Sequence, residues 1–505
     1  MRMDQLTTRR TNLWRAGLLA VLAACSVLAT ANPASAQPAN GEAPNPKTFP
    51  YRDLTKELAN KMAGTYTVTT VGDVLMVEPV SKEIDPRIQK ILHDADTTVG
   101  NMEVNIIDRR DWTTGFSENF APIETAWDVK ALGFSMMNGA NNHTFDMGEE
   151  GSRSTFKYLA EQGIPLAGVG PNLATARMPV FQLTPKGRVA MIGAVGGFMS
   201  TGIASDKDGN MGLERWGYNP VRSTTWNVVT REQLEYLRGM RDQIVARRDE
   251  LKDSAAIAVP KNDPDRVQLF GANFMAGPKI GEYYYEINKQ DLDANLAAIR
   301  NAKEYGDFAI FQLHAHMAPN AYQSVYVGHY PSQFITDFAH ALIDNGADIF
   351  LGSGLHSMQG IEIYKGRPIF YDLGEFVLEE IRIDRPDIPK GQTSVEADEL
   401  VKQRLQEPHV LMAVMATSKY QDGKLVEVRL QPVDLGVGQK RPWSKMGIPQ
   451  IPTAEMAQEI LTKLQEYSEP YHTKIDIENG VGIIRVPADA TVPVGGGIRA
   501  AAAKP

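Results

Sequence analysis

Polar residues that can bind divalent metals follow several apolar stretches of this chain. Asp73 and Glu103 follow two such stretches, and His314 and His356 follow two others much later in the sequence. Carboxylate, imidazole and amide groups together suit Mn²⁺, Fe or Zn²⁺. An ion held by such groups could activate water to attack a phosphorus or carbonyl centre, and a pair of ions could clamp both oxygens of an in-line displacement. The pattern therefore predicts a centre of one or two divalent ions.

The densest motif is the turn that follows the apolar run 134–137. It places Asn141, Asn142 and His143 together, and Asp146 comes shortly after them. Two amides, an imidazole and a carboxylate in one turn favour a binding or catalytic role. The structural alternative is an Asx-rich turn that caps the next helix.

A second motif is the pair His314 and His316, which follows the apolar run 308–313. Alternate residues of a strand point to the same side, so both rings would face one site if the strand continues. In the alternative, one ring packs in the core and the other is exposed.

Taken singly, the remaining residues have ordinary structural alternatives. Asp73 could be a helix N-cap, and Glu103 could be a surface carboxylate. His356 follows a Gly-Ser-Gly loop and could be a loop histidine with local hydrogen bonds. A metal-binding role is favoured only because all of these residues follow apolar runs.

The elements that must position these residues alternate between strands and helices. Such alternation predicts βαβ units and a largely parallel α/β sheet, which binds ligands at the carboxyl ends of its strands. The expected strands are 65–77, 97–103, 134–137, 164–168, 189–194, 308–313, 348–351, 361–364, 369–371, 409–417, 425–431 and 480–486. The expected helices are 51–63, 84–93, 123–132, 150–162, 231–252, 290–305, 332–345 and 454–468.

Composition divides the chain into segments around one main domain. We expect a signal peptide over 1–36, a linker with a short helix over 37–60, the main domain over 61–486 and a low-complexity tail over 487–505. Within the main domain, the less regular stretch 198–288 is predicted to be an insertion.

The N-terminus has the layout of an export signal. Four arginines precede the short apolar run 17–24, and the small residues 34–36 offer a cleavage site after Ala36. Cys25 also ends a sequence similar to a lipoprotein box, so lipidation there is the alternative. Either route predicts an exported protein of the periplasm or cell-envelope surface.

Charge and cysteine content exclude several classes of protein. The chain has 505 residues and a formal net charge of −9. Residues 1–36 carry four Arg and one Asp, a net +3, so the remainder carries −12. This charge argues against nucleic-acid binding and against a polybasic membrane surface. Because Cys25 is the single cysteine, the main domain has no disulfide framework, zinc ribbon or thiol active site.

The motifs together resemble a known family. They are VGDVLM from 71, GNME from 100, NNHTFDMG from 141, Leu313-His314, GSGLHSMQGIE from 352 and YDLGEF from 371. In order and spacing they are similar to the bacterial capsule-synthesis family CapA/PgsA, associated with poly-γ-glutamate capsules. The resemblance covers about 65 to 485 outside the insertion. It implies an α/β layered metallophosphoesterase-like (calcineurin-type) fold, with helices packed on mixed β-sheets, and a position outside the cytoplasm.

The resemblance also implies roles for single residues. Its metal ligands would be Asp73, Glu103, Asn142, His314 and His356. His143 would be catalytic, stabilising an oxyanion or protonating the leaving group. Gln359 and Glu362 would be neighbours of the last ligand.

The chain departs from the family pattern at several positions. Gly354 replaces the first histidine of the last motif, and Ala318 stands where a glutamate is common. His316 could compensate for either loss as a further metal ligand. Asp372 and Glu375 add two carboxylates, which could alter metal preference. Leu75 stands where two-metal phosphoesterases usually have a histidine, and CapA-like proteins also lack that histidine, so the resemblance favours a one-metal site over a full two-metal site.

Two functions remain open from the sequence. One is a metal-dependent hydrolase or transferase that acts on a phosphoester or an amide-linked envelope polymer during capsule or poly-γ-glutamate biosynthesis. The other is a non-catalytic factor that binds an anionic polymer or a membrane-bound capsule synthase, for which the basic pair Arg109-Arg110 and the stretch 240–252 are candidate contacts. A solute-binding lipoprotein would leave the cluster of metal-ligand residues unexplained.

Overall fold

The computed structural model describes residues 54–110, 120–197, 200–206, 214–251, 263–322, 329–379, 408–436 and 445–487. The expected signal peptide, Cys25 and the C-terminal tail lie outside these residues. None of the helices in the described part is both long and apolar enough to cross a membrane.

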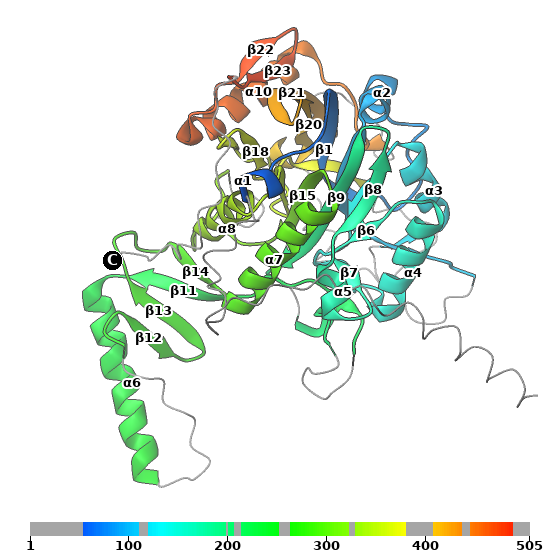
Figure 1. Cartoon of the computed structure of the whole chain (residues 1–505). Coiled ribbons are helices and arrows are strands. Elements are labelled where there is room, and N and C mark those ends of the chain that lie inside the picture. The colour runs from blue at the N-terminus through cyan, green and yellow to red at the C-terminus, as the bar shows by residue number, and fades with distance from the viewer. Residues whose placement is uncertain are drawn as a thin grey trace, which may run out of the picture. The chain divides into compact units, whose positions relative to one another are not determined.

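The first sheet has nine strands with a parallel centre and an antiparallel margin (Figure 1). Strands β1, β2, β5 and β6 run parallel, β19 pairs in parallel with β1, and β20, β21, β23 and β22 continue antiparallel on the other side. Their bounds are β1 Thr65–Leu75, β2 Thr97–Met102, β5 Met136–Asn138, β6 Leu166–Ala167, β19 Glu375–Leu378, β20 Met412–Gln421, β21 Lys424–Asp434, β22 Asp476–Glu478 and β23 Val481–Arg485.

The second sheet has six strands in the order β17-β18-β16-β15-β9-β8. Its four inner strands are parallel, and both edge strands are antiparallel to their neighbours. Their bounds are β8 Val180–Thr184, β9 Gly187–Gly196, β15 Phe308–Ala315, β16 Ile349–Ser353, β17 Ile361–Tyr364 and β18 Arg367–Phe370. The predicted mixed β-sheets are thus confirmed: in each of these two sheets, antiparallel strands pair at the edges of a parallel centre.

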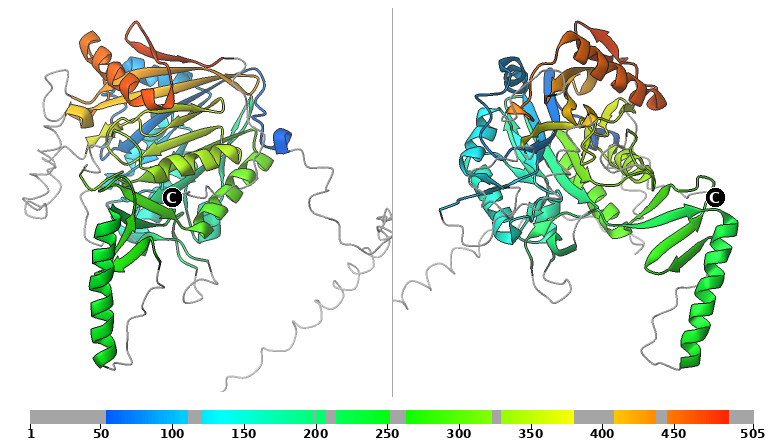
Figure 2. Two further views of the ribbon diagram at one scale, coloured as in Figure 1. Left: turned by 90° about the vertical axis from the view of Figure 1, so that its left-hand side faces the viewer. Right: turned by 180° about the vertical axis from the view of Figure 1, so that it is seen from behind.

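The two sheets face each other across an apolar core, and helices cover their outer faces. The central core joins Val68 of the first sheet to Ile310 and Leu351 of the second. A second cluster packs α2, α3 and α4 on the first sheet, and a third packs α7 and α8 on the second. These helices are α2 Pro86–Asp94, α3 Glu124–Ala131, α4 Gly148–Glu161, α7 Lys289–Tyr305 and α8 Gln333–Asp344. This order of helix, sheet, sheet and helix confirms the predicted layered α/β fold class (Figure 2).

Local sequence explains where these helices begin. Burial of one face supplies most of their stability, and side chains satisfy the first backbone N–H groups. Asn288 accepts hydrogen bonds from the N–H groups of Gln290 and Asp291 at the start of α7. Thr453 does the same for Met456 at the start of α10 Ala454–Ser468, which closes the end of the central core.

The structure corrects the helix expected over 51–63. In the described residues this region contains only α1 Leu54–Glu57. The Asn60 side chain accepts a hydrogen bond from the N–H of Met62, a local turn contact that competes with helix geometry. The backbone then enters β1 through Gly64, whose φ is 67°.

The predicted insertion forms its own small sheet beside the layered fold, in the order β12-β13-β11-β14 (Figure 1). The long helix α6 packs on this sheet through Leu234, which contacts Val267 and Leu269. The elements are β11 Ser223–Val229, α6 Arg231–Leu251, β12 Arg266–Leu269, β13 Ala272–Ala276 and β14 Tyr283–Ile287. Short elements complete the described residues: β3 Asn105–Ile107, β4 Phe120–Pro122, β7 Val169–Gly170, β10 Gly217–Tyr218, α5 Leu173–Arg177, and the 3₁₀ turns Ser200–Gly202, Pro408–Leu411 and Glu469–Tyr471.

Candidate metal centre

The metal-ligand residues lie at the carboxyl ends of parallel strands from both sheets. Asp73 lies on β1, Glu103 directly follows β2, and His314 lies on β15. His356 lies in the loop after β16, and its φ of 54° is in a region that few side chains other than glycine adopt. The backbone N–H of Gly354 in this loop donates to Asp73 Oδ2 at 3.1 Å, which ties the rims of the two sheets together.

His314 lies between the two carboxylates. Its Nδ1 is 3.4 Å from Asp73 Oδ1, and its Nε2 is 3.3 Å from Glu103 Oε1. All three side chains are at most 1% exposed. Their ligand atoms lie within 4.8 Å of one another, which is close enough for one cation to contact all three.

The other predicted histidines meet the same cluster. His316 Nε2 is 3.1 Å from His314 Nε2, and the His316 ring packs edge-on against His356. Glu103, His316 and His356 form a further group whose ligand atoms lie within 4.8 Å of one another. The alternative in which one histidine of the 314/316 pair is fully exposed is therefore wrong.

The Asn142 and His143 turn also reaches this rim. Asn142 Oδ1 is 2.7 Å from His314 Nε2, so the amide lies among the ligand atoms. His143 Nε2 is 4.0 Å from Glu103 Oε1, and its Nδ1 is 2.6 Å from Asp146 Oδ2. The structure thus brings together all seven residues predicted for the site, whose individual roles remain predictions.

A buried amide network orients Asp73, and the sequence did not single out its central residue. Asn101 Nδ2 donates to Asp73 Oδ1 at 2.8 Å. Asn101 Oδ1 accepts from Asn138 Nδ2 at 2.8 Å and from Asn141 Nδ2 at 3.2 Å. Asn141 therefore supports the neighbouring asparagines, and networks of this kind fix the orientation of ligands.

Two carboxylates absent from the predicted ligand set also lie here. Glu375 at the start of β19 contacts His356 Nδ1, and Asp73, His356 and Glu375 form a third group with ligand atoms within 4.8 Å. Asp372 accepts hydrogen bonds from the N–H groups of Leu355 and Gly374. The sequence indicated these two residues only as carboxylates, Asp372 and Glu375, that the family pattern lacks.

Gln359 and Glu362, the expected neighbours of the last ligand, differ in their surroundings. Gln359 is fully buried, and its N–H donates to the carbonyl of Asp372. Glu362 instead lies 2.9 Å from His340 Nε2 and accepts a hydrogen bond from the Tyr371 hydroxyl.

Burial and mutual charge shift the pKa values of the centre. Burial is the largest effect on Asp73 and would raise its pKa, but His314 and His356 together hold that pKa below its ordinary value. Burial lowers the pKa of His314, against the opposing effect of Asp73. Burial, followed by the charges of His314 and His356, lowers the pKa of His316 well below 6.5. A lowered pKa favours the ionised form of a carboxyl group and the neutral form of an imidazole, which are the forms that bind metal.

Asp372 shows the opposite shift. Burial, and then the charge of Asp73, raises its pKa well above 3.8. Several acidic groups thus share one buried rim, where Asp73, Glu103 and Glu375 contact histidines. A divalent cation would compensate this charge, so the donor set fits such an ion.

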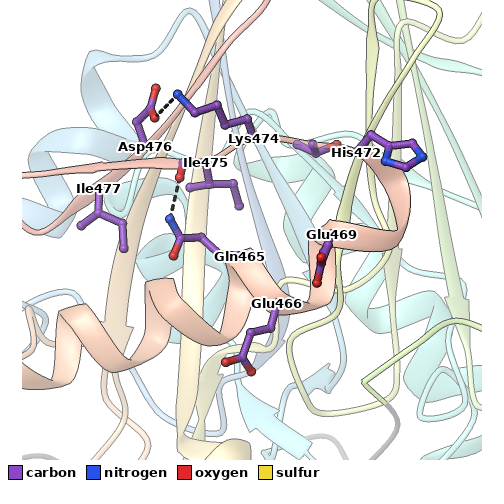
Figure 3. Close-up of a pocket in the computed structure, with 9 residues that line it drawn as sticks. Gln465, Glu466, Glu469, His472, Lys474, Ile475, Asp476 and Ile477 are labelled. Carbon is purple, nitrogen blue, oxygen red and sulfur yellow. Dashed lines mark hydrogen bonds and ion pairs between the residues drawn. The ribbon is translucent and has the colours of Figure 1, made fainter.

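A surface hollow elsewhere in the described residues lies apart from this chemistry. It is lined by the end of α10 and the segment leading into β22 (Figure 3). Lys474 pairs with Asp476 at 2.7 Å, and Gln465 donates to the carbonyl of Ile475. None of the ligand residues of the metal centre lines this hollow.

The layers and the rim of carboxylates and imidazoles define the class: a layered α/β protein with a candidate divalent-metal centre. Comparison with known families is more specific, because the profile of the bacterial capsule synthesis protein PGA_cap matches residues 67–380. The chain belongs to this family, as the resemblance implied, and the family has a metallophosphoesterase-like fold.

Relatives support this assignment. The uncharacterised protein y4sH of Sinorhizobium fredii is 34% identical over 86% of this chain and 96% of its own length. The capsule biosynthesis protein CapA of Bacillus anthracis is 25% identical over 62% of this chain and 60% of its own length. The PGA biosynthesis protein CapA of Bacillus subtilis is 21% identical over 67% of this chain and 68% of its own length.

Proposed function

We propose that this chain is an exported, metal-dependent hydrolase or transferase of capsule or poly-γ-glutamate biosynthesis. Its substrate is a phosphoester or an amide-linked polymer of the cell envelope. One observation carries the proposal: buried carboxylates and imidazoles from both sheets converge at a single rim. A bound divalent ion would polarise the substrate and activate water there.

His143 is the proposed acid or oxyanion-stabilising group. Its side chain is 20% exposed, whereas Glu103 beside it is fully buried, so His143 can meet a substrate that approaches from solvent. Asp146 contacts Nδ1 and leaves Nε2 directed towards Glu103. A carboxylate in this position orients an imidazole and stabilises its protonated form.

An anionic polymer is a plausible substrate only if local cations offset the charge of the chain. Without residues 1–36 the chain carries −12, which would repel polyglutamate or a phosphoester. The same ions that activate water would supply this local positive charge. A membrane-bound capsule synthase is the proposed source of the polymer.

The test uses the purified full chain and two readouts. We expect Mn²⁺ to bind after dialysis and to support cleavage of bis(p-nitrophenyl) phosphate. Asp73→Asn should lose both, and His143→Gln should keep the ion but lose roughly 10²–10⁴ in rate. His93→Gln on α2 is the matched control, since this histidine is exposed and lies outside the centre.

The outcomes separate the candidate functions. Absence of cation binding would contradict the proposal. Cation binding without cleavage of phosphoesters or of γ-linked glutamate polymers would favour the non-catalytic polymer-binding factor. Retention of activity in His143→Gln would remove that residue from the mechanism while leaving the metal centre in place.

A further inference from the structure

We infer that the insertion positions His316 in the metal centre, and that Tyr285 on β14 is the positioning residue. Its hydroxyl group holds the segment 317–321, which directly follows His316. The inference rests on the proposed function, because it concerns how one proposed ligand is held. It gives the insertion a role in the site that neither the sequence motifs nor the ligand set assigns to it.

His316 is the first residue beyond the ladder that holds its strand. Strand β15 ends at Ala315, and the last two pairs of its ladder with β9 join His314 to Val195 and Ala315 to Gly196. The ladder therefore fixes the backbone of His314 but not that of His316. A segment outside a ladder opens locally at low cost unless other contacts hold it.

The insertion supplies such contacts just after His316. Strand β14 is the strand of the small sheet nearest the layered fold (Figure 1). The N–H of Tyr283 donates to the carbonyl of Pro319 at 3.0 Å, and the N–H of Ala321 donates to the carbonyl of Gly281 at 2.8 Å. An antiparallel bridge lies between these two contacts. The segment after His316 thus pairs with the outer edge of the small sheet.

Tyr285 adds a side-chain contact closer to His316. Its Oη donates to the carbonyl of Ala318 at 2.7 Å. The side chain is 8% exposed, and its ring packs edge-on against Phe334 at the start of α8. A buried tyrosine ring of this kind is fixed by its neighbours, while its hydroxyl group satisfies a polar partner. The hydroxyl group therefore holds the chain two residues after His316.

The end of β9 restricts His316 from another segment. Gly197 has a φ of 67°, and a Cβ atom there would lie 3.1 Å from the carbonyl oxygen of His316. Only glycine combines this conformation with so close an approach at no steric cost. The His316 backbone is thus packed against the β9 end, and the contacts with β14 hold the residues that follow it.

The competing explanation is that burial of Met317 alone fixes His316. Met317 is 2% exposed and belongs to the same apolar cluster as Tyr285. In that case the Tyr285 hydroxyl would contribute to stability only. The two explanations differ in whether the effect of Tyr285 on cation affinity depends on His316, which a double-mutant cycle measures.

The experiment titrates the metal-stripped full chain with MnCl₂ by calorimetry. Tyr285→Phe should lower Mn²⁺ affinity about 10-fold, the lower end of the range for groups that orient metal ligands. In a His316→Gln background the same substitution should cause no further loss. Tyr420→Phe is the matched control, because the Tyr420 hydroxyl also donates to a backbone carbonyl, that of Asp348, at the opposite end of the strands. It should keep the affinity of the unmodified chain.

Hydrogen exchange of the metal-free proteins gives a readout that needs no bound ion. Amides of the segment 317–321 should exchange faster in Tyr285→Phe than in the unmodified chain, and Tyr420→Phe should leave them unchanged. If Tyr285→Phe fails to fold, Gly281→Ala disturbs the same pairing, because Gly281 has a φ of 82° that alanine adopts only with strain. It should give the same His316-dependent loss of affinity.

The outcomes separate this inference from the proposed function. Unchanged affinity in Tyr285→Phe, or an equal loss with and without His316, would overturn the positioning role and leave the metal function intact. If the unmodified chain binds no Mn²⁺, the proposed function fails, and unchanged exchange of 317–321 in Tyr285→Phe would overturn the positioning role as well.

Discussion

Strands β15 and β16 carry buried charged groups at both ends, but the two ends are built differently. At their amino ends, the lysine cluster of Lys303, Asp348 and Arg367 places two cationic side chains around one carboxylate. At their carboxyl ends, the metal centre combines three carboxylates with three imidazoles, and burial lowers the pKa values of His314 and His316. The residues of this centre are Asp73, Glu103, His314, His316, His356 and Glu375. Protein groups therefore compensate the buried carboxylate at the amino ends, whereas an added cation would compensate the carboxylates at the carboxyl ends.

The lysine cluster has the contacts of a structural ion pair. Lys303 Nζ lies 2.7 Å from Asp348 Oδ2, and both side chains are at most 1% exposed. Asp348 Oδ2 also accepts from the N–H of Ala309. Arg367 donates to the carbonyls of Ile343 and Ala347 at the end of α8. Removing one partner would leave a buried charge without compensation.

The largest expected effect is on stability, in the lysine cluster. Lys303→Met should lower the free energy of unfolding by about 3–5 kcal/mol, because it removes the closest ion-pair partner of the buried Asp348 and leaves only Arg367, at 3.7 Å. Urea unfolding measures this loss. Cation affinity of the folded fraction should not change, since the substitution lies at the opposite end of the strands.

A double variant checks the cause of this loss. Lys303→Met with Asp348→Asn removes both charges, so it should lose less stability than Lys303→Met alone. An equal or larger loss would show that packing around the Lys303 stem, rather than the unpaired charge, dominates.

Asp73→Asn should change cation affinity far more than stability. It removes a carboxylate whose pKa the two histidines lower, so the metal-free protein should lose some stability, but less than Lys303→Met, because the amide oxygen can still accept from Asn101. Cation affinity should fall by roughly 100-fold or more, since even the partners that orient a ligand contribute 10–100-fold. Calorimetric titration and thermal unfolding give the two quantities. A stability loss as large as that of Lys303→Met, with affinity unchanged, would make the metal centre structural.

The sequence predicted which residues meet at this rim because they follow runs of buried residues, while their binding of a metal stays a prediction. Strand β1 is buried along most of its length, and its pattern of apolar residues placed Asp73 near its end. The same logic placed His314 and His356. Local patterns carry this information because parallel strands present their carboxyl ends to one rim.

Tertiary pairing explains what the sequence could not reveal. The sequence marked Glu375 as an added carboxylate but could not place it beside Asp73, because β19 pairs with β1 across some three hundred residues and no local pattern specifies this register. Asn101 is a polar residue within a short strand, and its role depends on amides from two other segments. The antiparallel pairing at the edges of the sheets likewise depends on contacts between distant segments.

Asn101→Ala should cause a moderate loss at the metal centre. It removes the donor to Asp73 Oδ1 and the acceptor shared by Asn138 and Asn141. We expect cation affinity to fall about 10-fold, within the range for residues that orient metal ligands. Asn227→Ala is a control, because Asn227 donates to a backbone carbonyl within the small sheet of the insertion. Equal affinity in the two variants would rule out an orienting role for Asn101.

The smallest expected effect is a pH dependence of stability that arises from the histidines of the metal centre. The pKa values of His314 and His316 are below 6.5 in the folded chain, so the unfolded chain binds more protons as the pH falls below this value. Stability of the metal-free protein should therefore fall between about pH 7 and pH 5.5, with a slope of at most about 1.4 kcal/mol per pH unit for each histidine. His316→Gln should reduce that slope, as measured by urea unfolding. His93→Gln should keep it, because His93 is exposed and lies outside the metal centre. Because the raised pKa of Asp372 acts in the opposite sense, the test is the difference between the two slopes: equal slopes in His316→Gln and in the unmodified chain would mean that burial does not hold the His316 imidazole neutral.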